Sequence, residues 1–194
     1  MMSRSTVIDF LDHDLSPGIG LAFLYCNHKD NLDQSAEYFL GAIVRQLVAR
    51  RPTMQDEVHS LYRKHSGRGT NPTRHEYADL LGLLSHGYSE VYVVIDALDE
   101  CIDAKRRFIW SELLSALKSS VTNLRLLYTS REIADIAGIL KGSTSIPIRA
   151  SEADIEAYVR AQVKTENSLL EFFERDAELE TRIPLVIASK AEGM

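Results

Sequence analysis

The sequence predicts an α/β protein whose parallel sheet is flanked by helices. Three short apolar runs have the length and the β-branched or aromatic content of buried strands: residues 20–26, 91–95 and 123–129. Segments with a helical spacing of apolar residues separate these runs. Strands that alternate with helices pair in parallel through crossover connections. A chain of 194 residues, 45% of them hydrophobic, is long enough to bury the core of such a fold.

The helices between the strands are predicted from their apolar stripes and from the residues that begin or end them. Asp33 is the expected N-cap of a helix whose stripe covers residues 36–48 and which Pro52 stops. Thr73 and Glu76 have the spacing of a capping box at the start of another helix. The same criteria predict four further helices, at residues 6–11, 54–65, 105–118 and 133–140.

The C-terminal part of the chain is expected to be mostly helical. Residues 145–149 form a predicted short strand, and Pro147 places it at an edge of the sheet because proline cannot donate to a ladder. Ser151 and the acid three residues later have the spacing of a capping box, so a helix should begin there. Residues 166–194 continue as helix, with a break expected near Pro184.

The most informative chemistry lies in residues 91–101, which read VYVVIDALDEC. Asp96, Asp99 and Glu100 follow a buried strand directly, at the edge of a parallel sheet where α/β proteins bind ligands. An Asp there can hold Mg²⁺, usually through water, and a Glu a few residues on can orient or deprotonate an attacking water. The alternative is that these acids cap the next helix, because acidic side chains favour a helix N-terminus.

A second group of polar residues, Thr129, Ser130 and Arg131, stands at the end of the next predicted strand. If the two strands are neighbours, these side chains and the acids converge on one crevice. Thr129 and Ser130 could then orient water or a cofactor, and Arg131 could stabilise charge on a γ-phosphate. The alternative is a structural salt bridge between Arg131 and the acids, which is compatible with the first interpretation.

Composition and missing motifs argue against several classes of protein. The net charge of −6 argues against a nucleic-acid binder, and no apolar run is long enough to cross a membrane. Cys26 and Cys101 each end an apolar run, so buried reduced thiols and a cytoplasmic location are expected. There is no zinc-ligand spacing and no G-x-S-x-G elbow. A metal-dependent nuclease built on the three acids would need further acids or a catalytic Lys, for which the chain has no motif.

Several segments match patterns of one known family. Residues 93–101 (VVIDALDEC) and 124–132 (LRLLYTSRE) resemble the Walker B segment and the sensor strand of the NACHT class of P-loop NTPases. The resemblance is to fungal NACHT proteins of the nephrocystin-3-like N-terminal type, whose domain often precedes ankyrin or WD repeats. Four further segments of the chain contribute to it: residues 23–30, 35–48, 150–159 and 188–194. The likeness therefore covers nearly the whole chain.

This resemblance implies roles for the strand-end residues. Asp96 would be the Walker B acid linked to Mg²⁺, and Glu100, together with Asp99, would position the hydrolytic water. Arg131 would be the sensor arginine near the γ-phosphate. Members of the family act as ATP- or GTP-driven switches in which nucleotide exchange permits oligomerisation and other domains carry the signal. In fungi such proteins are linked to self/non-self recognition and programmed cell death.

The phosphate loop of this family, G-x-x-x-x-G-K-[S/T], does not occur in the sequence. Residues 4–11 resemble the end of the helix that the loop opens, so the loop and the central strand before it are expected upstream of Met1. We therefore expect a partial NACHT core at 1–150 and a helical segment at 151–194. The sheet should have a gap, or its last two strands should pair directly. Because the loop supplies most of the phosphate binding, this chain alone should bind nucleotide weakly or not at all, without turnover.

An alternative function is a non-catalytic interaction or oligomerisation module derived from a NACHT domain. Bases outnumber acids between residues 45 and 74, and acids outnumber bases from residue 151 to the end. Solvated helix faces explain this asymmetry. The alternative is an electrostatic contact between neighbouring subunits or domains. Self-association and binding to other NACHT subunits are the partner interactions expected of such a module.

Overall fold

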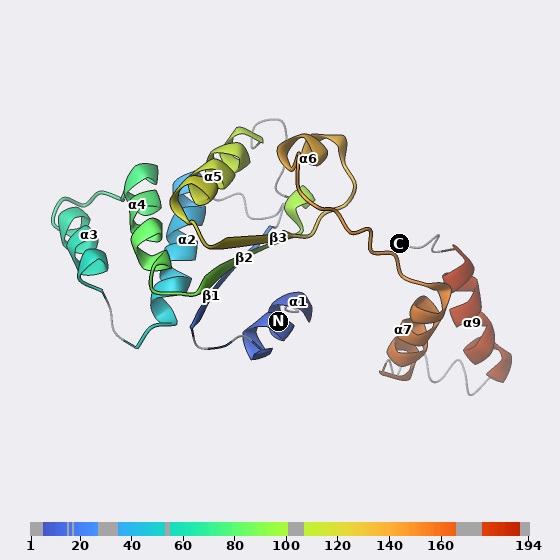
Figure 1. The fold of residues 1–194 in the computed structure, drawn as a ribbon. Helices are drawn as coiled ribbons and strands as arrows, with labels where there is room; N and C mark the ends of the chain where they lie inside the picture. Colours follow the sequence, from blue (N-terminus) through green and yellow to red (C-terminus); the bar gives the residue numbers. More distant parts are fainter. Residues whose placement is uncertain are drawn as a thin grey trace. The chain divides into compact units, whose positions relative to one another are not determined.

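The computed structural model describes residues 6–14, 16, 18–26, 35–52, 55–100, 107–165 and 176–190. The chain divides into two compact units, residues 1–142 and 143–194. The first unit contains, in order, α1 (Thr6–Asp14), β1 (Ile19–Tyr25), α2 (Ala36–Ala49), α3 (Asp56–Ser66), α4 (Arg74–Ser85), β2 (Glu90–Asp96), the 3-10 turn η1 (Leu98–Glu100), α5 (Arg107–Ser120), β3 (Leu124–Tyr128) and α6 (Ala134–Ile139). The second contains α7 (Glu152–Thr165) and α9 (Ala177–Lys190) (Figure 1).

The three strands form one parallel sheet in the order β1-β2-β3, so the predicted α/β class is confirmed. In its register, Tyr25 lies beside Asp96, and Ile95 lies beside Tyr128. All three strands run the same way, so their carboxyl ends lie at one edge of the sheet.

The two faces of the sheet are covered unequally. On one face, α2, α4 and α5 lie together, and their apolar side chains form the main core with alternate residues of the strands (Figure 1). Trp110 of α5 is buried there and contacts the ring of Phe39 of α2, with 4.8 Å between ring centroids. On the other face, α1 inserts Ile8 against Leu21 and Val94. The period-2 alternation of the strands is what allows each face its own core.

The helices begin largely where the sequence indicates. Thr73 and Glu76 form the predicted capping box of α4. The N-cap of α2, however, is Ser35 and not Asp33, which lies outside the described residues. The Ser35 Oγ accepts a hydrogen bond from the backbone N–H of Tyr38 at 3.2 Å, three residues on, as a capping serine does.

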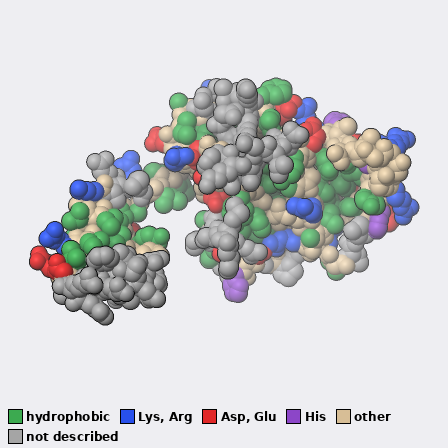
Figure 2. Space-filling model, turned by 180° about the vertical axis from the view of Figure 1, so that it is seen from behind, with side chains coloured by type: hydrophobic (Ala, Val, Ile, Leu, Met, Phe, Trp, Pro, Cys, Tyr) green, Lys and Arg blue, Asp and Glu red, His purple; other side chains and the backbone are tan. Residues whose placement is uncertain are grey.

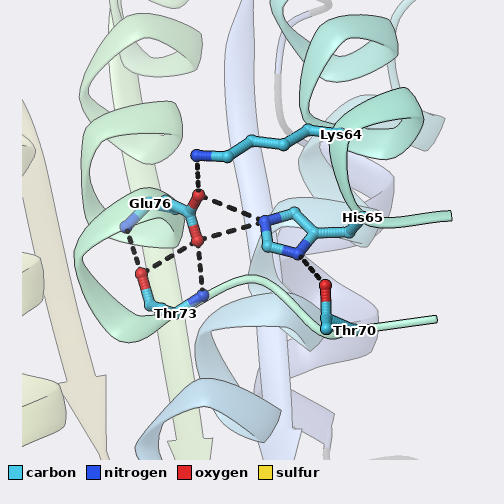
Figure 3. A network of polar contacts seen from close by, with 5 residues as sticks. All are labelled: Lys64, His65, Thr70, Thr73 and Glu76. Atoms are coloured by element: carbon cyan, nitrogen blue, oxygen red, sulfur yellow. Dashed lines mark hydrogen bonds and ion pairs between the residues drawn. The ribbon is translucent and has the colours of Figure 1, made fainter. Parts of the chain in front are cut away.

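A network of polar contacts holds α3 to the start of α4 (Figure 3). Lys64 Nζ donates to Glu76 Oε1 at 2.5 Å, and His65 Nε2 lies 3.1 Å from both carboxylate oxygens. His65 Nδ1 lies 2.8 Å from the hydroxyl of Thr70, and the backbone N–H of Thr73 donates to Glu76 at 2.8 Å. The residues of α3 are at most partly buried, so this network is a substantial part of its attachment.

At one edge of the sheet, a side chain binds the backbone of a strand residue. Gln46 of α2 donates from Nε2 to the carbonyl oxygen of Phe23 at 2.8 Å, and its Oε1 accepts from the N–H of Phe23 at 3.0 Å. The amide of Gln46 therefore occupies both polar groups of the backbone in the middle of β1, as a neighbouring strand would.

The prediction of a strand at residues 145–149 is wrong. Residues 143–150 have no regular structure, and the side chains of Ile146 and Ile148 are 78% and 88% exposed. Within the described residues no strand pairs with the outer edge of β3, so neither a gap between strands nor a direct pairing with this segment is formed. The alternation of apolar residues is present, but Pro147 cannot donate to a ladder and the segment has no neighbouring strand to pair with.

In the second unit, α7 and α9 pack against each other. Ser151 and Asp154 form the predicted cap of α7. The Ser151 Oγ donates to Asp154 Oδ2 at 2.6 Å, and the backbone N–H of Asp154 donates to the Ser151 Oγ at 3.1 Å. The break expected near Pro184 does not occur, because α9 runs through this residue. Pro184 is buried, so its packing can offset the one hydrogen bond that a proline removes.

The structure also bears on the membrane and cysteine expectations. None of the described helices is both long and apolar enough to span a membrane. Cys26 is buried, as predicted, whereas Cys101 lies outside the described residues.

Candidate functional site

The candidate site lies at the carboxyl ends of β2 and β3, which are neighbours in the sheet. Asp96 is the last residue of β2, and the turn η1 carries Asp99 and Glu100 directly after it. The segment from Thr129 to Arg131 follows β3. The two groups of polar residues found in the sequence are therefore brought to one edge of the sheet.

Thr129 joins the two strand ends. Its hydroxyl donates to Asp96 Oδ1 at 2.5 Å and accepts a hydrogen bond from the backbone N–H of Ala97 at 2.9 Å. The backbone continues the connection, because the N–H of Thr129 donates to Ile95 and the carbonyl oxygen of Thr129 accepts from the N–H of Leu98. One hydroxyl thus fixes both the orientation of the Asp96 carboxylate and the exit of the chain from β2.

The turn after β2 adopts an uncommon backbone conformation. Ala97 has a φ of 56°, in the left-handed region that costs a residue with a Cβ atom about 1–2 kcal/mol. The next residue, Leu98, is fully buried in the main core and anchors the turn. The sequence gives no signal for this conformation, since glycine or asparagine is the residue type that usually marks it.

Asp99 and Arg131 form an ion pair. The backbone N–H of Arg131 donates to Asp99 Oδ1 at 3.1 Å, and its Nε donates to Oδ2 at 2.5 Å. The side chain of Asp99 is 5% exposed, whereas that of Arg131 is 78% exposed. Burial alone would raise the pKa of Asp99, but the hydrogen bonds from Arg131 outweigh burial and lower it. Asp99 is therefore charged at neutral pH, and both of its carboxylate oxygens accept hydrogen bonds from Arg131. The alternative role as a helix cap involves residues 101–106, which lie outside the described residues.

The remaining two residues are exposed. The Ser130 Oγ donates to the carbonyl oxygen of Arg131 at 2.7 Å, so its hydroxyl is directed to the backbone and not to the acids. Glu100 closes the turn through its N–H, which donates to the carbonyl oxygen of Ala97 at 2.9 Å. Its exposed side chain stands at the outer end of the same turn.

The carboxylates do not form a complete metal site by themselves. Over the described ranges, no group of three or more His, Cys, Asp or Glu side chains is arranged to hold a metal ion. Asp99 is occupied by Arg131, which leaves Asp96 as the carboxylate at the strand end. One carboxylate with water and phosphate oxygens is a donor set that suits Mg²⁺, so these residues fit an ion that arrives with a phosphate ligand.

A separate hollow of about 630 Å³ lies between α5 and α6. Its lining residues are Phe108, Ser111, Leu114, Ser115, Lys118, Gly138 and Ile139. None of them belongs to the strand ends, whereas Asp96 contacts Thr129 and Asp99 contacts Arg131 there. We therefore place the candidate site at β2 and β3 and not in this hollow.

Comparison with known proteins places the chain in a family. Residues 2–131 match the family described as nephrocystin 3, N-terminal. Vegetative incompatibility protein HET-E-1 of Podospora anserina is 25% identical over 143 residues, which are 71% of this chain and 10% of that protein. The chain thus spans about a tenth of the length of the curated relative it matches. No solved structure matches it. The matched residues include the three described strands and the strand-end polar groups, and the chain belongs to the nephrocystin 3 N-terminal family.

Proposed function

We propose that this chain is part of a NACHT-type signalling switch that binds ATP or GTP with Mg²⁺. The observation that carries the proposal is the meeting of two polar pairs, Asp96 with Thr129 and Asp99 with Arg131, at the carboxyl ends of adjacent parallel strands. Ligands of α/β proteins bind at this edge. The membership in the nephrocystin 3 N-terminal family and the likeness to a vegetative incompatibility protein support a signalling role.

Each residue has a distinct role in this proposal. Asp96, oriented by the hydroxyl of Thr129, holds Mg²⁺ through water. Glu100, on the exposed end of η1, orients the attacking water. Arg131 offers its guanidinium to the charge that develops on the γ-phosphate.

In the proposal, the 194-residue chain does not hydrolyse nucleotide on its own. Its sequence contains no phosphate loop, and the backbone N–H groups and lysine of that loop supply most of the binding in P-loop proteins. Calorimetric titration of the chain with Mg-ATP and with Mg-GTP tests this statement. We expect no binding tighter than millimolar, and a low-micromolar affinity for either nucleotide would contradict it.

A second candidate function, a non-catalytic interaction module, is favoured by the surface of the smaller unit. Four large apolar side chains of α7 and α9 are exposed: Tyr158, Leu185, Val186 and Ile187. Figure 2 shows hydrophobic side chains in green on this unit, at the left of the view. Light scattering on the wild-type chain and on a Leu185→Ser, Ile187→Ser variant distinguishes the candidates, because a module that self-associates here should become monomeric in the variant.

A further inference from the structure

The ion pair between Asp99 and Arg131 joins a nearly buried carboxylate to an exposed guanidinium. Asp99 lies in η1, whose backbone is held by the buried Leu98 and by the hydrogen bond from Leu98 N–H to Thr129. Arg131 lies in a segment without regular structure between β3 and α6, and most of its side chain is exposed. The carboxylate is therefore the stationary member of the pair, and the guanidinium is the member that can change partners.

The same contacts determine how Arg131 presents itself to an anion. Its Nε is bound to Asp99, and its Nη nitrogens make no hydrogen bond to any residue of the described part of the chain. The charge of the guanidinium is nevertheless balanced by the carboxylate beside it. An anion that approaches the strand ends thus meets a neutral pair together with the acidic Asp96 and Glu100.

We propose that Asp99 competes with anionic ligands for Arg131 and so lowers the affinity of the strand ends for phosphate groups. A phosphate group must draw the guanidinium from Asp99, and this leaves a charged, nearly buried carboxylate without its partner. Asp99 is in this view a regulatory residue and not the acid that activates water. The inference rests on the proposed function for its biological meaning, whereas the competition itself requires only an anion.

Binding of tripolyphosphate and of Mg-ATP to the same set of variants tests the competition. The Asp99→Asn variant keeps an acceptor for the Arg131 N–H and removes the charge. We expect it to bind tripolyphosphate about three- to tenfold more tightly than the wild type, because one nearby negative charge is lost. The matched control is Glu132→Gln, which removes an exposed charge beside Arg131 in the sequence, and its affinity should change less than about twofold. The gain should disappear in the double variant Asp99→Asn, Arg131→Gln.

The proposed competition is refuted if Asp99→Asn binds tripolyphosphate no more tightly than the wild type, or if it shows no binding at millimolar concentration. It is also refuted if the double variant Asp99→Asn, Arg131→Gln keeps the higher affinity. Mg-ATP separates this result from the proposed function. A gain with tripolyphosphate would uphold the competition whatever Mg-ATP does, whereas low-micromolar binding of Mg-ATP to the wild type would contradict only the expectation that this chain alone binds nucleotide weakly.

The wild-type chain offers a second measurement if Asp99→Asn does not fold. The NMR signal of the Arg131 Nε–H group reports its bond to Asp99 directly. Tripolyphosphate should shift this signal, and a signal that stays unchanged while Asp96 and Thr129 respond would overturn the inference.

Discussion

The hydroxyl of Thr129 is the smallest group whose removal should disturb the whole candidate site. Replacing Thr129 with Val keeps the branched shape and deletes the hydrogen bonds to Asp96 and to the N–H of Ala97. A hydrogen bond to a charged group contributes about 1.5–3 kcal/mol, and an N–H left without an acceptor costs about 1–3 kcal/mol. Because both partners are only partly buried, water can recover part of this loss. We therefore expect the free energy of unfolding to fall by about 2 kcal/mol.

The assay is urea unfolding followed by the fluorescence of Trp110, which is the single tryptophan of the chain and is buried in the first unit. The midpoint should fall without a change in the slope, since the area exposed on unfolding is the same. In thermal unfolding, the same change corresponds to a lower midpoint by about 4–8 °C.

Two variants serve as controls for this experiment. Thr129→Ser retains the hydroxyl and should recover most of the lost stability. Thr122→Val removes a hydroxyl from an exposed turn and should change the free energy of unfolding by less than about 0.5 kcal/mol. The reasoning is refuted if Thr129→Val behaves like Thr122→Val, or if Thr129→Ser is destabilised as strongly as Thr129→Val.

Three further predictions concern the same unit. Ala97→Gly should raise the free energy of unfolding in urea by about 0.5–1 kcal/mol, because removing the Cβ strain at a φ of 56° outweighs the greater freedom of glycine in the unfolded state. A lower free energy of unfolding would contradict the idea that the backbone is strained at Ala97. Tyr88→Phe removes a buried hydrogen bond of 2.6 Å to the carbonyl oxygen of Leu47 and should cost about 1–3 kcal/mol, whereas Tyr62→Phe, at a tyrosine that is 69% exposed, should cost almost nothing. Lys64, then Thr73 and His65, hold the pKa of Glu76 well below its usual 4.5, so Glu76 stabilises the fold above that pH and loses this effect as the pH falls. The deficit of Glu76→Gln relative to the wild type should therefore be largest at neutral pH and shrink in acid, and a deficit that grew in acid would contradict the network.

The sequence predicts well which polar residues meet at the strand ends, and poorly how they contact one another. Asp96 and Thr129 follow two apolar runs, and neighbouring parallel strands must bring their ends together, so their meeting could be anticipated. The pairing of Arg131 with Asp99 was one of two open alternatives, because spacing does not reveal which acid an arginine will contact. The left-handed turn at Ala97 carried no signal, since the surrounding contacts and not the residue type impose it.

The errors elsewhere in the fold have a common origin. The patterns at residues 145–149 and at Pro184 are local and carry no information about the neighbours of these residues. A strand exists only when another backbone supplies its hydrogen bonds, and residues 145–149 have no such partner in the described fold. In α9, Pro184 is buried, so packing can offset the hydrogen bond that a proline removes. Both outcomes depend on tertiary contacts that a single sequence does not display.

The contact between Gln46 and Phe23 makes the two edges of the described sheet unequal. On β1, the amide occupies the N–H and the carbonyl oxygen of Phe23, whereas no described strand pairs with the outer edge of β3. A further strand would therefore meet less competition for backbone hydrogen bonds at β3 than at β1. A Gln46→Ala substitution would free both groups of Phe23, so one side chain away from the candidate site lowers the capacity of the β1 edge to pair.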